Sequence, residues 1–180
     1  MGVPWIDSIK GSGQLSVFNK APAWADGFHA AMIDFNHLGL GVKLVAAKDE
    51  KSANVVVLVS SGPGQYNYQG DIASTDNDFK PDRLHGQTAA LAHDELKDRF
   101  FAAIFLPGQV KGTKKQREVI IVHEFIHAAG MVEHDTVGIM FPQMQASNGG
   151  LLEYLPERGA KAMPPIRVGR QTASIVRGLW

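Results

Sequence analysis

Two histidines with a glutamate beside the first are the residues of this chain whose types and spacing are best suited to do chemistry. In the stretch His123–His127 the two imidazoles are four positions apart and share one face of a helix. Imidazole nitrogens bind zinc, and the carboxylate of Glu124 can take a proton from a water molecule held between the ligands. The spacing predicts two ligands and the general base of a catalytic zinc site.

A catalytic zinc site needs a third protein ligand and an open position. Two candidates follow closely, Glu133 and His134. We favour His134, because imidazole suits zinc and a turn after Gly130 tolerates an additional residue. Glu133 stays open as the alternative, which gives a site of two histidines and one glutamate.

The helix that carries this motif is the best delimited element in the sequence. Thr113 and Gln116 have the spacing of a capping box at a helix start. Residues 114–129 continue without glycine or proline, and Gly130 can adopt the positive φ that ends a helix. Three apolar residues of this helix are expected to pack inward: Val119, Val122 and Ile126.

Hydrophobic periodicity predicts the elements that support this helix. Trp24, Phe28, Met32 and Phe35 recur at helical spacing, which indicates a helix over about residues 23–36. Strands are expected at residues 42–46, 55–59, 88–93 and 100–106, and a closing helix at about 168–179. The strand at 55–59 has the continuous apolar pattern of burial on both faces. Residues 60–87 are expected to form a long surface loop.

The motif and the residues after it resemble the metzincin zinc metallopeptidases, whose motif is HExxHxxGxxH followed by a methionine turn. His123, Glu124, His127 and Gly130 match that motif. The stretch 138–142, with Met140 before Phe and Pro, resembles the methionine turn of the matrixin branch.

The chain departs from the family pattern at the third ligand. The family histidine falls where this chain has Glu133, and His134 comes one position later. A gluzincin-type peptidase is a further alternative, in which a glutamate on a later helix is the third ligand. Glu153 and Glu157 lie at a suitable distance along the chain for that role.

The resemblance implies an α+β fold with a mixed, twisted sheet of about five strands. A helix backs this sheet, and an active-site helix, a methionine turn and a C-terminal helix follow. Met140 is expected beneath the metal. We expect one catalytic domain over residues 1–180, with a sheet subdomain over about 1–130 and a C-terminal subdomain over about 131–180.

The function that the resemblance implies is a zinc metalloendopeptidase, which hydrolyses peptide bonds with a zinc-activated water and Glu124 as general base. The substrate is expected to be an extended peptide or protein segment that pairs with an edge strand containing Ala89, Leu91 and His93. The alternative is a zinc-binding structural or interaction module of the same fold without catalysis. Glu124 argues against that alternative, because a structural zinc site has no use for a base.

A second metal, either structural zinc or calcium, is a further expectation. Matrixins bind a structural zinc with histidines in the region of His85 and His93, and clustered carboxylates suit calcium. The aspartates concerned are Asp71, Asp76, Asp78 and Asp82. The strand at 100–106 lacks the histidine that the family uses for this zinc.

Composition limits the remaining possibilities. Eighteen basic residues balance eighteen acidic ones, which gives no basis for a nucleic-acid or membrane partner. The chain has no cysteine, so disulfides and thiolate ligands are excluded. No signal peptide or membrane-spanning run is apparent. We expect a soluble monomer in a bacterial or phage setting.

Overall fold

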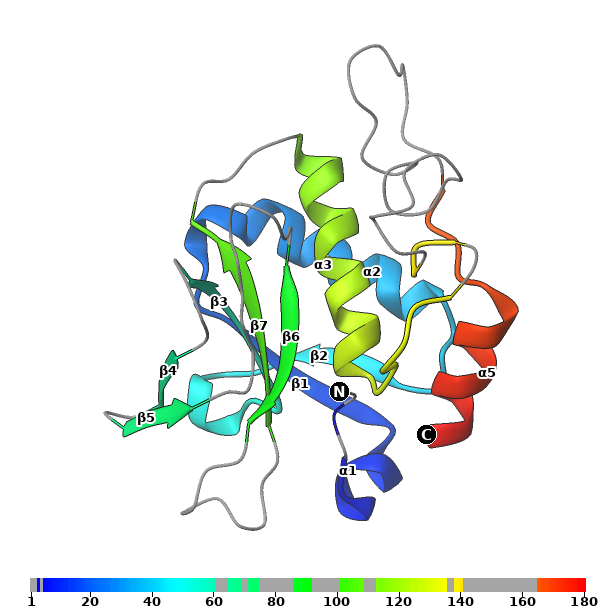
Figure 1. Cartoon of the computed structure of the whole chain (residues 1–180), viewed down its shortest axis with the longest axis horizontal. Coiled ribbons are helices and arrows are strands. Elements are labelled where there is room, and N and C mark those ends of the chain that lie inside the picture. The colour runs from blue at the N-terminus through cyan, green and yellow to red at the C-terminus, as the bar shows by residue number, and fades with distance from the viewer. Residues whose placement is uncertain are drawn as a thin grey trace.

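The protein is described by a computed structural model at residues 3, 5–60, 65–68, 71–74, 86–91, 101–108, 113–135, 138–140 and 165–180. These residues form a mixed α+β fold with a five-stranded, mostly parallel sheet and helices packed against it (Figure 1). The expected α+β class and the expected mixed sheet of about five strands are confirmed.

The order of strands in the sheet is β2-β1-β3-β7-β6. The strands are β1 (Gln14–Asn19), β2 (Lys43–Ala46), β3 (Val55–Ser60), β6 (Gln87–Leu91) and β7 (Phe101–Pro107). All neighbouring pairs are parallel except β6 with β7, so β6 is an antiparallel strand at one edge of the described sheet. An edge strand leaves one row of backbone groups available for another chain.

Three findings differ from the sequence expectations. Strand β1 lies inside the sheet although no strand was expected there, since its apolar alternation is confined to Leu15 and Val17. Strands β4 (Gln65–Tyr68) and β5 (Asp71–Ser74) pair antiparallel within the expected loop, where polar neighbours obscure β-favouring residues. In β3, Val59 is 40% exposed, so burial on both faces holds only for the first half.

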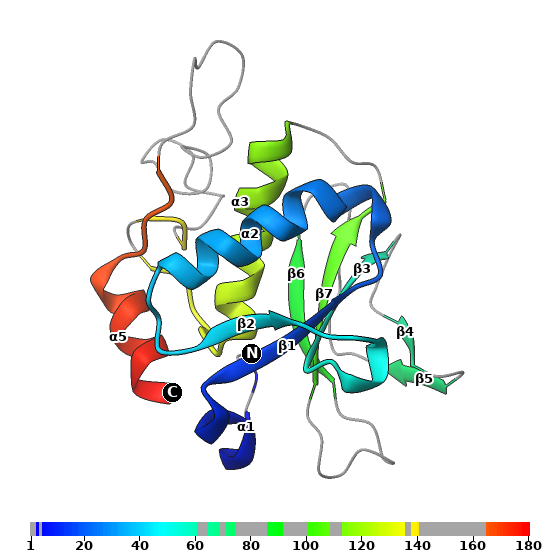
Figure 2. The ribbon, with the colours of Figure 1, turned by 180° about the vertical axis from the view of Figure 1, so that it is seen from behind.

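Two long helices pack on the same face of the sheet (Figure 2). They are α2 (Ala25–His37), which follows a short 3-10 helix η1 (Pro22–Trp24), and α3 (Lys114–Ala128). The shorter helices are α1 (Asp7–Ser12), η2 (Glu50–Ser52) and α5 (Arg170–Leu179). Among the described residues, no helix has the length and apolar character that crossing a membrane requires.

Aromatic packing between α2 and α3 fixes the position of the motif-bearing helix. The ring of Phe125 meets the rings of Phe28 and Phe35 edge to face, at centroid distances of 6.0 and 6.1 Å. Edge-to-face contacts of this kind add to the energy of burial. The same apolar cluster includes residues of β1, β3 and β7, so α3 is held against both α2 and the sheet.

Candidate metal centre

The start of α3 is fixed by its own first residues. The backbone N–H of Gln116 donates to Thr113 Oγ1 at 3.2 Å, and the backbone N–H of Thr113 donates to Gln116 Oε1 at 2.7 Å. The predicted capping box is therefore confirmed. It satisfies backbone donors that the first turn of a helix leaves unpaired.

The end of α3 turns the chain back over the helix. The backbone N–H of Gly130 donates to the His127 carbonyl at 3.0 Å, and that of Met131 donates to the Ile126 carbonyl at 3.2 Å. This pair of bonds is the Schellman arrangement. It requires the left-handed backbone of Gly130, whose φ is +113°. The reversal directs the segment after Gly130 toward the histidines of α3.

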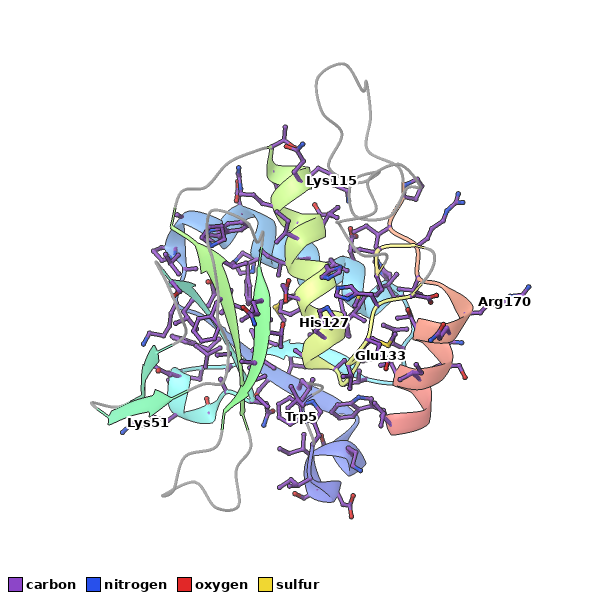
Figure 3. The ribbon with its side chains drawn as sticks, in the orientation of Figure 1. Trp5, Lys51, Lys115, His127, Glu133 and Arg170 are labelled. Carbon is purple, nitrogen blue, oxygen red and sulfur yellow. The ribbon has the colours of Figure 1, made fainter. Side chains whose placement is uncertain are left out.

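Three imidazoles converge where this segment meets α3. His123 is buried, His127 is half-buried and His134 is exposed, and one ligand nitrogen from each lies within 4.8 Å of the others. The ring centroids are 4.8 to 5.3 Å apart. Figure 3 shows His127 on α3, with Glu133 on the segment that leaves the end of the helix.

Main-chain carbonyls orient the two imidazoles of α3. The Nδ1 of His123 lies 2.8 Å from the Ile139 carbonyl oxygen, and the Nδ1 of His127 lies 2.7 Å from that of Met131. A carbonyl oxygen only accepts, so each Nδ1 carries the proton and donates it. Each Nε2 is then the nitrogen with the lone pair, which is the tautomer that binds a metal.

The distance between these two Nε2 atoms fits a metal site. It is 3.2 Å. Two ligand nitrogens about 2.05 Å from a tetrahedral zinc ion lie about 3.3 Å apart. Two lone pairs that face one another at this distance repel unless a cation lies between them. The three histidines can therefore hold a metal ion.

Loss of hydration favours the neutral form of two of the three histidines. Loss of hydration lowers the pKa of His127 to about 4, and it also lowers the pKa of His134. A histidine must be deprotonated at its ligand nitrogen to bind a metal, so both shifts favour the binding form at neutral pH.

The carboxyl group of Glu124 lies in a different environment, between α3 and β6. Glu124 is buried, and the Thr88 hydroxyl donates to its Oε2 at 2.8 Å. Burial raises the pKa of Glu124 to about 7, and the bond from Thr88 opposes that rise. A carboxyl group with a pKa near neutrality can both take up and release a proton at physiological pH.

The segment that follows His134 is tied to two other parts of the chain. The buried carboxylate of Asp135 accepts the backbone N–H and the hydroxyl of Thr172, at the start of α5, at 3.0 and 2.8 Å. The backbone N–H of Asp135 donates to the Met140 carbonyl at 2.9 Å. Because Asp135 follows His134 directly, these bonds hold the third imidazole in place.

The structure brings some of the candidate residues together and places others apart. His123, His127 and His134 form one cluster, whereas Glu133 is exposed and is not part of it. Met140 is buried in the main apolar core, and Ala89 is buried in β6. The remaining candidates lie outside the residues whose side chains are described: Asp71, Asp76, Asp78, Asp82, His85, Leu91, His93, Glu153 and Glu157.

Sequence reasoning missed the residues that support the site. Thr88 contacts Glu124, and the carbonyls of Met131 and Ile139 orient the imidazoles. Every residue has a backbone carbonyl, so no residue type signals the last two. Thr88 is the only one of the three with a sequence signal, a hydroxyl in an expected strand.

Comparison of the sequence with models of known protein families finds no match, and comparison with curated proteins finds none either. The case for a function therefore depends on the geometry of the site.

Proposed function

We propose that this chain is a zinc-dependent metallopeptidase of the metzincin type. One observation carries the proposal: three imidazoles, two of them fixed in the metal-binding tautomer, converge beside a buried glutamate on the same helix. A structural zinc site needs the ligands alone. The adjacent carboxyl group adds a proton acceptor, which is what hydrolysis requires.

We assign His123, His127 and His134 as the ligands. His134 lies with the other two imidazoles, while Glu133 is exposed and outside the cluster. Three neutral ligands leave the charge of the metal uncompensated, which favours acidification of a water molecule. The donor set of three imidazoles fits zinc.

The residues of the chain then divide the chemistry between them. Zinc in this site would supply a Lewis acid that polarises the scissile carbonyl and acidifies the attacking water. Glu124 accepts the proton of that water and passes it to the nitrogen of the leaving amine. The Ile139 and Met131 carbonyls keep both helix imidazoles oriented, with the proton on Nδ1 and the lone pair on Nε2.

The substrate of the proposed reaction is an extended peptide segment. Strand β6 is an edge of the described sheet and lies next to α3, so a peptide that pairs with it passes close to Glu124. Pairing with an edge strand recognises the main chain of a peptide, and side-chain pockets add preference.

The experiment that tests the function replaces Glu124 with Gln in the zinc-loaded protein. We expect zinc to stay bound and chelator-sensitive cleavage of a mixed peptide library to fall at least about 100-fold, because loss of a general base costs that much or more. The same change at Glu50, in η2, is the matched control and should leave cleavage unchanged. Turnover by Glu124→Gln at the wild-type rate contradicts the mechanism. Absence of chelator-sensitive cleavage in the wild-type protein favours the non-catalytic zinc module instead.

A further inference from the structure

The first residues of β6 contact the proposed general base directly. The Thr88 hydroxyl lies 2.8 Å from Oε2 of Glu124 and 3.0 Å from the backbone carbonyl oxygen of the same residue. A hydroxyl has one proton to donate, and an ionised carboxylate is a stronger acceptor than a carbonyl. The bond to Oε2 is therefore the main one while Glu124 is charged.

Gly86 lies against the other side of the same carboxyl group. A Cβ atom at this position would lie 2.9 Å from both Cγ and Oε1 of Glu124, and 3.1 Å from Cδ. Real Cβ atoms do not approach so closely, so only glycine leaves the Glu124 side chain where it is. Gly86, which directly precedes β6, and Thr88 within it thus enclose the carboxyl group from two directions.

We propose that Thr88 is a positioning residue for Glu124, with Gly86 providing the space. The hydroxyl holds Oε2 and leaves Oε1 as the oxygen that takes the proton of the water and returns it to the leaving amine. Thr88 keeps its own proton throughout. This inference deepens the proposed function and rests on it, since it assigns a role within that reaction.

Strand β6 then has two tasks in one element. Its open edge receives the peptide, while a side chain on its helix-facing side fixes the base that acts on that peptide. The alternation of a strand makes this possible, because Thr88 and Ala90 face the helices while Ala89 faces away. Because the same strand holds the carboxyl group of the base and pairs with the substrate, it fixes their relative position, on which the rate of the chemical step depends.

The test compares Thr88→Val with Thr88→Ser in the zinc-loaded protein. Valine keeps the shape and the preference for a strand but removes the donor, while serine keeps the hydroxyl. We expect Thr88→Val to lower kcat on the order of 10-fold with KM and zinc content unchanged, as expected for loss of a bond to a charged group. Thr88→Ser should stay within about 2-fold of the wild-type kcat. Gly86→Ala should lower kcat in the same way, because the new Cβ displaces the carboxyl group.

A second readout does not depend on activity. The carboxyl carbon signal of Glu124, labelled with carbon-13 and assigned by its loss in Glu124→Gln, should move in Thr88→Val and return in Thr88→Ser. An unmoved signal in Thr88→Val, an equal loss of kcat in both variants, or a change in KM alone overturns the inference. The two proposals can fail separately. If the signal moves in Thr88→Val and not in Thr88→Ser, while the wild-type protein shows no chelator-sensitive cleavage, the bond from Thr88 is supported and the proposed function is overturned.

Discussion

The two ends of α3 are held by different kinds of interaction. At its start, Thr113 caps the helix, Arg117 pairs with Asp26, and Lys115 pairs with Asp34 at 3.0 Å. The cap joins side chains to the backbone, the two ion pairs join partly exposed side chains, and the hydrogen bond from Arg117 lowers the pKa of Asp26. Exposed ion pairs of this kind contribute little to stability.

At its other end, α3 is held through its own carbonyl groups. The indole N–H of Trp5 donates to the Ala128 carbonyl at 2.7 Å, and that of Trp180 donates to the Ala129 carbonyl at 2.8 Å. The two indole rings lie 6.5 Å apart. Figure 3 shows Lys115 and Trp5 at the opposite ends of the helix. The last carbonyls of a helix have no partner within it, and here residues near both ends of the chain supply one.

The contrast follows from what each end has to do. The start of α3 carries none of the three clustered histidines. The end carries His127 and leads to His134, whose nitrogens must meet within a fraction of an ångström to share a metal. Indole bonds to the main chain, one of them buried, restrain that end more closely than partly exposed ion pairs restrain the other.

The largest expected effect is on the metal site at the end of α3. Replacing His134 with Ala should lower zinc affinity at least about 100-fold, since loss of partners that only orient the ligands already costs 10- to 100-fold. Glu133→Ala should change the affinity by about 2-fold or less, as at other exposed positions. A competition titration with a zinc chelator measures both. If Glu133→Ala lowers the zinc affinity more than His134→Ala does, the assignment of His134 as the third ligand is wrong.

The same contrast explains what the sequence reveals about the fold. The start of α3 was predicted correctly and its end to within one residue, because the signals at Thr113 and Gly130 are local. Strand β1 was missed because it pairs with β2 and β3, which are remote along the chain, and its own pattern is only two apolar residues long. Local chemistry marks where an element begins or ends, whereas partners in a sheet are set by the whole chain.

The site follows the same rule. His123 and His127 are four positions apart, and residues at this spacing share one face of a helix, so the sequence alone predicts that their side chains are neighbours. The bond from Thr88 to Glu124 joins residues 36 positions apart, and the bond from Trp5 to Ala128 joins residues 123 positions apart. Such contacts have no local pattern and become visible only in the folded chain.

The next largest effect concerns the glycine that ends α3. Gly130→Ala should lower the free energy of unfolding by about 1–3 kcal/mol, because alanine at a φ of +113° is strained and the exposed Leu179 side chain, 2.7 Å from the new Cβ, must move. The matched control is Gly11→Ala within α1, where a Cβ has nothing within 4 Å. That change should stabilise the protein by about 0.5–1 kcal/mol. Denaturant unfolding of the metal-free proteins measures both, and equal effects contradict the need for glycine at the helix end.

The smallest effects compare the two ends of α3 directly. Trp5→Phe removes the donor to a buried carbonyl and should cost about 1–2 kcal/mol of unfolding free energy, since a buried acceptor without a partner is not rehydrated. Trp180→Phe should cost less, because the bond to Ala129 is only partly buried. Thr113→Ala should cost about 1 kcal/mol or less, because water replaces the lost cap at this exposed position. Denaturant unfolding of the three metal-free variants gives the order. A cost for Thr113→Ala above that for Trp5→Phe means that the start of α3, and not its end near the histidine cluster, is the more firmly held.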